Sequence, residues 1–336
     1  MRQIDLRSDT VTQPTPEMRT VMAEALVGDD VFGDDQTINR LEQTAAQTLG
    51  TEAAIFASSG TQTNLLALLS HCRRGDEYIV GQAAHTYRYE AGGAAVLGSI
   101  QPQPLDLEAD GSMDLIKIQQ VIKPDDFHFA RSRLLCLENT HNGLAVPLDY
   151  FADAARCARA NDLRLHLDGA RIFNAAVKSG VAVTEISTHF DTISVCLSKG
   201  LGAPVGSVLC GDEKTIRDAR RWRKMLGGGM RQAGIIGAAG LYALENNCER
   251  LQYDHDNARR LAEGLGKIEG FEVEYPEAQT NMVFVTPPDQ LADRFQSLMA
   301  EHNILILGGG RVRLVTHLDI STDDIDYVVD RVNGFG

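Results

Sequence analysis

The hydrophobic and polar positions of this chain first follow a helical period and then change pattern. Thr15 and Pro16 indicate a helix start, because threonine caps a helix and proline suits its first turn. A second helix is expected from about Thr37, since apolar residues share one face as far as Leu49 and Gly50 ends it. Beyond it, short apolar runs typical of buried strands alternate with helical segments. The predicted strands are 53–57, 77–81, 100–105, 133–138, 163–167, 192–197 and 205–210.

This alternation of strands and helices predicts an α/β fold with a mostly parallel, doubly wound central sheet. Long helical segments then run to about position 266, and a smaller α+β domain is expected after them, with strands near 271–274, 281–286, 304–307 and 312–316. A chain of 336 residues is also too long for one simple core. We therefore expect an N-terminal segment and large domain over residues 1–248 and a small C-terminal domain over residues 249–336.

A lysine and an aspartate each follow one of these strands. Asp168 and Lys199 are 199 − 168 = 31 positions apart, about one strand–helix–strand unit, so both are expected at the carboxyl edge of the sheet. Partial removal from water lowers the pKa of a lysine, and its neutral amine can form a Schiff base. An aspartate can keep a pyridine nitrogen protonated. The pair therefore suits pyridoxal 5'-phosphate (PLP), although each residue alone is as well explained by a surface turn or a helix cap.

Three further features are candidates for the same site. Gly60 and Thr61 belong to a run of small residues that opens a helix, where free backbone N–H groups can bind one phosphate or simply be capped. His85 follows a strand and can stack on a cofactor ring, although a lone histidine is more often a loop residue. Arg311 and Arg313 flank one strand position and so share a face. The basic run at 217–231 is either a solvated helix face or a contact to a phosphate or a neighbouring subunit.

Composition and charge narrow the possible partners. The formal charge of −14 argues against nucleic acid and anionic membranes, and the composition of 43% hydrophobic and 23% charged residues is that of an ordinary globular protein. The six cysteines form no C-x-x-C pair, so we expect reduced thiols rather than disulfides, and no metal site. No apolar run is long enough to cross a membrane, and the N-terminus lacks a signal-peptide core. We expect a cytoplasmic protein.

Six motifs in a fixed order relate the chain to a known family. They are Asp5-Leu6-Arg7-Ser8-Asp9-Thr10-Val11-Thr12, Gly28-Asp29-Asp30-Val31, Glu138-Asn139-Thr140-His141-Asn142-Gly143, His166-Leu167-Asp168-Gly169-Ala170-Arg171, Ser198-Lys199-Gly200-Leu201-Gly202-Ala203-Pro204-Val205-Gly206 and Gly227-Gly228-Gly229-Met230-Arg231-Gln232. Each motif alone is only modestly specific, but together they span nearly the whole chain. On these residues the chain resembles the bacterial low-specificity L-threonine aldolases, PLP-dependent enzymes of the aspartate-aminotransferase fold (fold type I).

The resemblance implies a role for each candidate residue. Lys199 would form the Schiff base with PLP, Asp168 would pair with the pyridine nitrogen, and His85 would stack on the ring. Gly60 and Thr61 would bind the phosphate, helped by Arg231 from another subunit, and Arg171 would also contact the cofactor. The substrate carboxylate would be held by Ser8, Arg171 and Arg313, with Lys224 at the edge of the pocket and His128 beside the substrate hydroxyl. The active site would therefore lie at a subunit interface of a dimer or tetramer.

Two positions depart from the family pattern. Phe32 stands where a tyrosine is usual and Leu144 where a lysine often occurs. The loss of a hydroxyl at position 32 would alter preference at the β-carbon without touching the PLP chemistry.

The expected reaction is the reversible cleavage of L-threonine or L-allo-threonine to glycine and acetaldehyde. Its general base is left open between His85, His128 and an ordered water. Another fold-type-I PLP lyase or an aminotransferase on a small amino acid is the nearest alternative, because the same lysine and aspartate serve that whole group. A non-catalytic phosphate-binding regulator would give Lys199 no role. A nicotinamide dehydrogenase lacks its Gly-x-Gly-x-x-Gly motif after the first strand.

Overall fold

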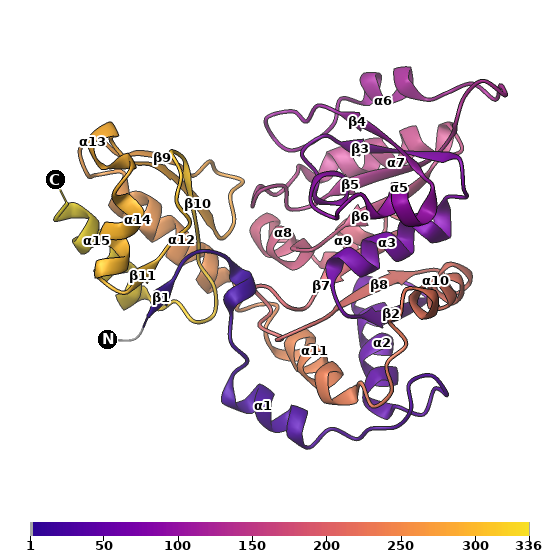
Figure 1. Ribbon diagram of the computed structural model, residues 1–336, viewed down its shortest axis with the longest axis horizontal. Helices are drawn as coiled ribbons and strands as arrows, with labels where there is room; N and C mark the ends of the chain where they lie inside the picture. Colours follow the sequence, from indigo (N-terminus) through magenta and orange to yellow (C-terminus); the bar gives the residue numbers. More distant parts are fainter. Residues whose placement is uncertain (1–2, 336) are drawn as a thin grey trace.

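The computed structural model describes residues 3–335, which form a larger and a smaller lobe (Figure 1). The larger lobe is built on a seven-stranded sheet in the order β2-β8-β7-β6-β5-β3-β4. Its strands are β2 (Ala53–Ala57), β3 (Asp76–Gly81), β4 (Gln101–Leu105), β5 (Arg131–Glu138), β6 (Arg164–Asp168), β7 (Thr192–Cys196) and β8 (Ser207–Gly211). Each of the seven strands predicted for this lobe is confirmed, with ends shifted by at most two residues.

The sheet is mixed, with a single strand reversed. The strands β4, β3, β5, β6 and β7 pair in parallel, whereas β8 is antiparallel to both of its neighbours. A parallel partner needs a crossover of about a dozen residues or more, and the loop from β7 to β8 is shorter than that. The expected mostly parallel sheet is therefore confirmed, and the reversed β8 follows from the short loop that carries Lys199.

Helices cover both faces of this sheet. Alternate residues of β2 are apolar on both faces of the sheet. Ala54 and Phe56 belong to one hydrophobic cluster, and Ile55 and Ala57 belong to another on the opposite face, so helices bury both faces. The helices α3 and α10 lie on the second of these faces. The helices of this lobe are α1 (Pro16–Ala23), α2 (Gln36–Leu49), α3 (Gly60–His71), α4 (His85–Arg88), α5 (Gly93–Gly98), α6 (Leu115–Val121), α7 (Leu148–Ala160), α8 (Ile172–Ser179), α9 (Val183–Ser187), α10 (Glu213–Met225) and α11 (Gly234–Asn246).

The two helices expected near the N-terminus begin and end as their sequence signals indicate. The side chain of Thr15 accepts a hydrogen bond from the backbone N–H of Met18, and Pro16 is the first helical residue. At the end of α2, Gly50 adopts the left-handed conformation with φ of 66°, which glycine accepts without strain.

The smaller lobe has its own hydrophobic core around the antiparallel sheet β12-β10-β9. Its strands are β9 (Glu272–Glu274), β10 (Met282–Thr286), β11 (Ile304–Leu305) and β12 (Val312–Val315). Its helices are α12 (Leu251–Leu265), α13 (Asp289–Ala292), α14 (Phe295–Glu301) and α15 (Thr322–Asn333). The predicted smaller α+β unit is therefore present.

The beginning of the chain belongs to this second core. Strand β1 (Ile4–Asp5) pairs in parallel with β11, and Ile4 and Leu6 are buried in the cluster of the smaller lobe. The short 3₁₀ helix η1 (Asp9–Val11) then carries the chain to the larger lobe. We therefore propose that residues 3–6 be counted with residues 249–335, whereas the sequence assigns them to the large domain. No helix within residues 3–335 has both the length and the apolar character needed to cross a membrane.

Candidate active site

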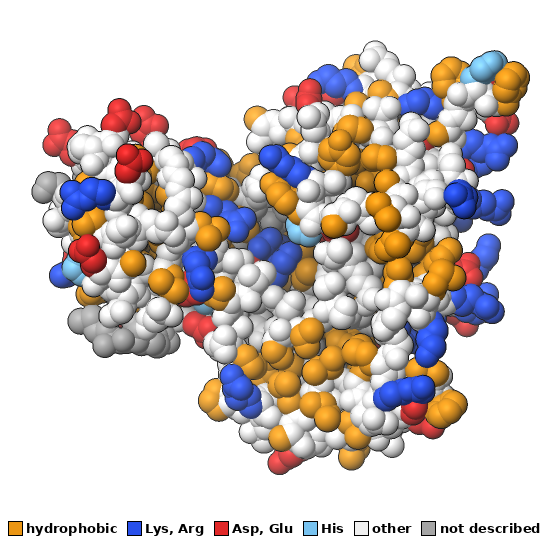
Figure 2. Space-filling model, viewed as in Figure 1, with side chains coloured by type: hydrophobic (Ala, Val, Ile, Leu, Met, Phe, Trp, Pro, Cys, Tyr) orange, Lys and Arg blue, Asp and Glu red, His pale blue; other side chains and the backbone are white. Residues whose placement is uncertain are grey.

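A pocket of about 660 Å³ lies between the two lobes, within the size range of small-molecule sites. Figure 2 shows this hollow, with lysine and arginine side chains gathered around it. The larger lobe contributes the carboxyl ends of β6 and β7 and the start of α3, and the smaller lobe contributes residues of β10 and β12. The pocket brings together seven of the predicted residues, namely Gly60, Thr61, His85, Asp168, Arg171, Lys199 and Arg313.

Asp168 and Lys199 reach the pocket from adjacent parallel strands. Asp168 is the last residue of β6 and is only 3% exposed, while Lys199 lies in the loop after β7 and is half-buried. The carboxylate of Asp168 accepts hydrogen bonds from the Ala170 N–H at 3.2 Å and from Asn64 Nδ2 at 2.9 Å. Burial raises the pKa of Asp168 and the charge of Glu138 raises it further, whereas Lys199 opposes both. A carboxylate and an amine thus face one pocket from defined backbone positions.

The start of α3 offers a site for an anion. Ser59 caps the helix by accepting a hydrogen bond from the Gln62 N–H at 3.2 Å. The N–H groups of Gly60 and Thr61 open the helix, where no intrahelical partner exists for them. A Cβ built on Gly60 would lie 2.7 Å from Cys196 Sγ, so the helix start packs against the end of β7. Only glycine allows this approach, which puts the anion site beside the strand that leads to Lys199.

The two arginines expected to bind a carboxylate are not equivalent. Arg171 already forms a bidentate ion pair with the fully buried Asp9, with Nε 2.7 Å and Nη2 2.6 Å from its carboxylate oxygens. Burial by itself raises the pKa of Asp9, but Arg171 outweighs it and holds that pKa well below its usual range. Arg313 has no hydrogen-bond or ion-pair partner within residues 3–335, and its Nε is buried. Burial and the nearby charge of Arg171 lower the pKa of Arg313, so an anion in the pocket would stabilise both cations.

His85 is held by two carboxylates. Its Nδ1 lies 2.9 Å from Glu90 Oε1, and its backbone N–H donates to Glu138 Oε2 at 2.7 Å. The hydrogen bond with Glu90 raises the pKa of His85. Potential ligand atoms of His85, Glu90 and Asp168 lie within 4.8 Å of one another, but Asn64 donates to both carboxylates, so the group is a hydrogen-bond network.

Four predicted residues do not line this pocket within the described chain. Ser8 caps η1, where its Oγ accepts a hydrogen bond from the Thr10 N–H. Its neighbour Asp9, by contrast, binds the pocket residue Arg171. Lys224 is exposed on α10, and the exposed Arg231 pairs with Asp29 at 3.0 Å. His128 lies in an exposed loop between α6 and β5 and hydrogen-bonds Asp126 at 2.7 Å.

The two positions that depart from the family pattern also lie away from the pocket lining. Phe32 is 76% exposed in the loop between α1 and α2, and Leu144 forms isolated bridges with His141 and Gln279.

Several residues that shape the site were not singled out from the sequence. Asp9, Asn64, Glu90 and Glu138 bind Arg171, Asp168 or His85, as described above. Asp9 and Glu138 belong to the family motifs, and Asn64 lies one helical turn after Gly60. The sequence positions of these three residues could therefore have marked them as candidates for the site. Glu90 has no such signal, because its contact depends on how the short helix α4 folds back toward α3.

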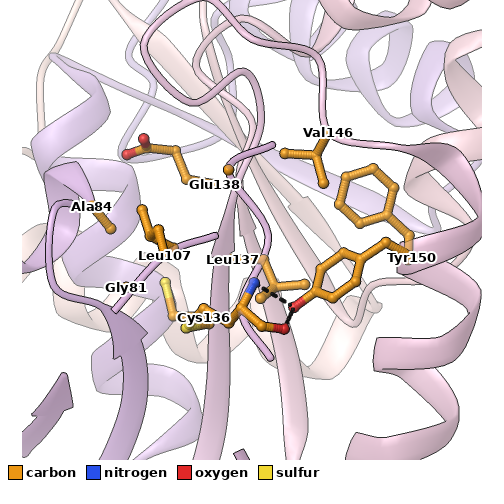
Figure 3. A pocket seen from close by; sticks show the side chains of 11 residues that line it. Gly81, Ala84, Leu107, Cys136, Leu137, Glu138, Val146 and Tyr150 are labelled. Atoms are coloured by element: carbon orange, nitrogen blue, oxygen red, sulfur yellow. Dashed lines mark hydrogen bonds between the residues drawn. The ribbon is translucent and has the colours of Figure 1, made fainter. Parts of the chain in front are cut away.

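A second pocket, of only about 10 Å³, lies deeper in the larger lobe (Figure 3). Its walls are mostly apolar, and the Tyr150 hydroxyl beside it is bound to both backbone groups of Met113, at 3.1 and 2.9 Å. Figure 3 shows the carboxylate of Glu138 pointing away from Tyr150. The space holds one water molecule at most and is a packing void of the core.

Comparison with known proteins shows the family and the fold of this chain. The chain matches the β-eliminating lyase family over residues 5–287. It is 55% identical to the low specificity L-threonine aldolase of Escherichia coli (strain K12) over 332 residues, 99% of each chain. Its fold is similar to that of a threonine aldolase from Leishmania major, with a TM-score of 0.82 at 21% identity over 98% of this chain and 99% of that one. A structure of SPT with PLP has a TM-score of 0.79 at 17% identity, over 99% of this chain and 87% of that one.

Proposed function

Because the chain belongs to the β-eliminating lyase family and matches a threonine aldolase along almost its whole length, we infer that it is a PLP-dependent lyase that cleaves L-threonine to glycine and acetaldehyde. L-allo-threonine is the expected second substrate, and the reaction is reversible. The observation that carries this inference is the convergence on one pocket of Lys199, Asp168 and Arg313, which has no partner among residues 3–335.

The residues of the pocket fit PLP. A buried carboxylate, a lysine and a helix start with free N–H groups match the three polar features of the cofactor, which are a ring nitrogen, an aldehyde and a phosphate. Lys199 would hold the aldehyde carbon, Asp168 would face the ring nitrogen, and Gly60 and Thr61 would bind the phosphate. When bound, PLP supplies an electron sink for the pair of electrons released at Cα.

The chain's own residues would orient the amino acid and handle its protons. Arg313 has no hydrogen-bond partner within residues 3–335 and would donate to the carboxylate, while Asp9 holds Arg171 beside it. Fixing the carboxylate decides which bond at Cα is aligned for cleavage.

A base must take the substrate hydroxyl proton as the Cα–Cβ bond breaks, and Cα must regain a proton before glycine leaves. His85 is the histidine candidate within this chain, because Glu90 engages its Nδ1 and Nε2 has no partner in residues 3–335. An ordered water held by His85 is the alternative base.

The function is tested by incubating the purified protein and PLP with each substrate and measuring products. We expect glycine and acetaldehyde in equal amounts from both L-threonine and L-allo-threonine. The two substrates differ only in the direction of one hydroxyl, worth about 1–3 kcal/mol in a permissive pocket, so their kcat/KM values should differ by less than about a thousandfold. Ammonia with a keto acid, or amino transfer to a keto acid, would instead indicate another PLP lyase or an aminotransferase.

We also propose that the active enzyme is a homo-oligomer, a dimer or tetramer, in which a second copy completes the site. Hydrophobic side chains gather on the surface over α1, α11 and the loop after α1 (Figure 2), and those exposed include Leu26, Phe32 and Ile235. Arg231 and His128 do not line their own pocket, and Phe127 beside His128 is 93% exposed. Arg231 would bind the phosphate of a neighbouring subunit, and His128 would reach a neighbouring pocket.

Mixing two inactive variants tests this arrangement. Lys199→Ala subunits lack the lysine, and Arg231→Ala subunits lack the phosphate arginine. We expect activity to return after subunit exchange, because a hybrid contains one site with both residues intact. Each variant mixed with itself is the control, and light scattering gives the number of subunits. Hybrids that form but stay as inactive as their parents would mean that both residues act within one chain.

We further propose a cytoplasmic location. All six cysteines are unpaired and five of them are buried, as expected of a protein in a reducing compartment.

A further inference from the structure

A continuous line of buried hydrogen bonds runs behind Asp168, away from the pocket. Asn64 Nδ2 lies 2.9 Å from Asp168 Oδ2, and Asn64 Oδ1 lies 3.1 Å from His166 Nε2. On its other side, His166 Nδ1 lies 2.9 Å from Thr192 Oγ1, which in turn lies 2.9 Å from His71 Nε2. The line joins α3 to β6 and β7, on which it packs, and ends at the last residue of that helix.

The direction of every hydrogen bond in this line can be assigned. Asn64 Nδ2 faces two carboxylates, of Asp168 and Glu90, so both of its hydrogens are donated and the opposite amide orientation would be repulsive. Asn64 Oδ1 must therefore accept from His166 Nε2–H. Burial lowers the pKa of His166 to about 3, so the ring is neutral and its Nδ1 accepts from the Thr192 hydroxyl. Thr192 then accepts from His71 Nε2–H.

All four hydrogen bonds thus donate toward Asp168. Donors aligned in one direction polarise one another, and a hydrogen bond donated to a carboxylate favours its ionised form. The ionised carboxylate of Asp168 needs such stabilisation, because burial and the charge of Glu138 both oppose a negative charge there. Asn64 also donates to Glu90 at 2.8 Å, and Glu90 binds the ring of His85. One amide therefore connects both residues that would contact the cofactor ring.

We propose that Asn64, His166 and Thr192 are positioning residues that act through Asp168, holding its carboxylate ionised and aimed at the ring nitrogen of PLP. None of the three needs to take part in proton transfer. The inference rests on the proposed function only in that Asp168 faces the cofactor.

Matched substitutions separate this role from ordinary packing. Thr192→Val removes the hydroxyl that donates to His166 Nδ1, and His166→Leu removes the donor to Asn64, while His166→Gln retains an N–H donor. Thr63→Val is the control, because Thr63 is equally buried on α3 and its hydroxyl bonds Ser194 and the Gly60 carbonyl, outside the line of hydrogen bonds that ends at the Asp168 carboxylate. The dissociation constant of PLP is measured by titrating each apoprotein and following absorbance, with thermal unfolding of the apoproteins as a check on folding.

We expect His166→Leu to weaken PLP binding about tenfold or more and Thr192→Val to weaken it less, while Thr63→Val binds as the wild type does. His166→Gln should recover most of the loss. If His166 acts through Asp168, adding His166→Leu to an Asp168→Asn protein should cause little further change.

Two results would overturn the proposal. One is a His166→Leu protein that binds PLP as tightly as the wild type. The other is the same loss from His166→Leu whether or not Asp168 is present, since the residue would then act through the fold alone. If His166→Leu does not fold, the PLP affinities of Thr192→Val and Thr63→Val are compared instead. Equal affinities of these two variants would also overturn the proposal. A wild-type protein that binds no PLP would instead refute the proposed function.

Discussion

Replacing Lys199 by alanine is expected to lower turnover of L-threonine by at least about 10⁴-fold, a loss typical of removing a covalent catalytic group. Within residues 3–335, Lys199 is the lysine that lines the pocket between the lobes, together with the buried Asp168. Without the Lys199 amine, the chain would lack the group that attaches PLP covalently and that the substrate amine then displaces. Acetaldehyde release in a coupled assay measures the effect.

Lys178→Ala is the matched control, because Lys178 is a partly buried lysine on α8 that does not line the pocket. It should keep wild-type turnover. Borohydride treatment adds a readout independent of activity, since it should fix PLP to the wild type and to Lys178→Ala but not to Lys199→Ala. Near-normal acetaldehyde release from Lys199→Ala would exclude the covalent role.

Replacing Arg313 by leucine is expected to lower kcat/KM for L-threonine by about 10²–10⁴-fold. Among the described residues, Arg313 is the pocket arginine without a partner, so it can give two charge-assisted hydrogen bonds to the substrate carboxylate, each worth about 1.5–3 kcal/mol. Most of the loss should appear in KM, with a further loss in kcat because the carboxylate contact also orients Cα. Steady-state kinetics with L-threonine separates the two.

Arg311 offers a close control on the same side of the smaller lobe. It also lines the pocket, but Glu274 binds it at 2.7 and 2.8 Å and it stacks over Phe284. Arg311→Leu should therefore change kcat/KM by much less than Arg313→Leu does. Equal losses from the two substitutions would show that general positive charge, and not a specific carboxylate contact, guides the substrate.

Strand ends proved to be the most informative local signal in this chain. Asp168 and Lys199 were expected at the carboxyl edge of one sheet because each follows a short apolar run, and the two strands are indeed parallel neighbours. Gly60 and Thr61 were expected to open a helix, and they do. These features depend on residues close together in the chain, so hydrophobic period, capping and glycine positions are sufficient to predict them.

Contacts between distant segments could not be predicted in this way. The ion pair between Asp9 and Arg171 joins residues 162 positions apart, and it leaves Arg313 as the pocket arginine without a hydrogen-bond partner in the part of the chain that the structure describes. The hydrogen bond between Asn64 and Asp168 spans 104 positions. Each residue type has many possible partners in a chain of this length, and only the packing of α3 on the sheet and the position of η1 beside Arg171 select one.

By itself, therefore, the amino-acid sequence determined the order of helices and strands, the α/β class, and the pair of Asp168 and Lys199 that points to PLP. The tertiary structure decided that β1 packs in the smaller lobe, that β8 runs against its neighbours, and which arginine remains free. It also decided that His128 and Arg231 lie away from their own pocket. The physical reason is that local propensity and periodicity act over a few residues, whereas the partner of a buried charge is chosen by where distant elements pack.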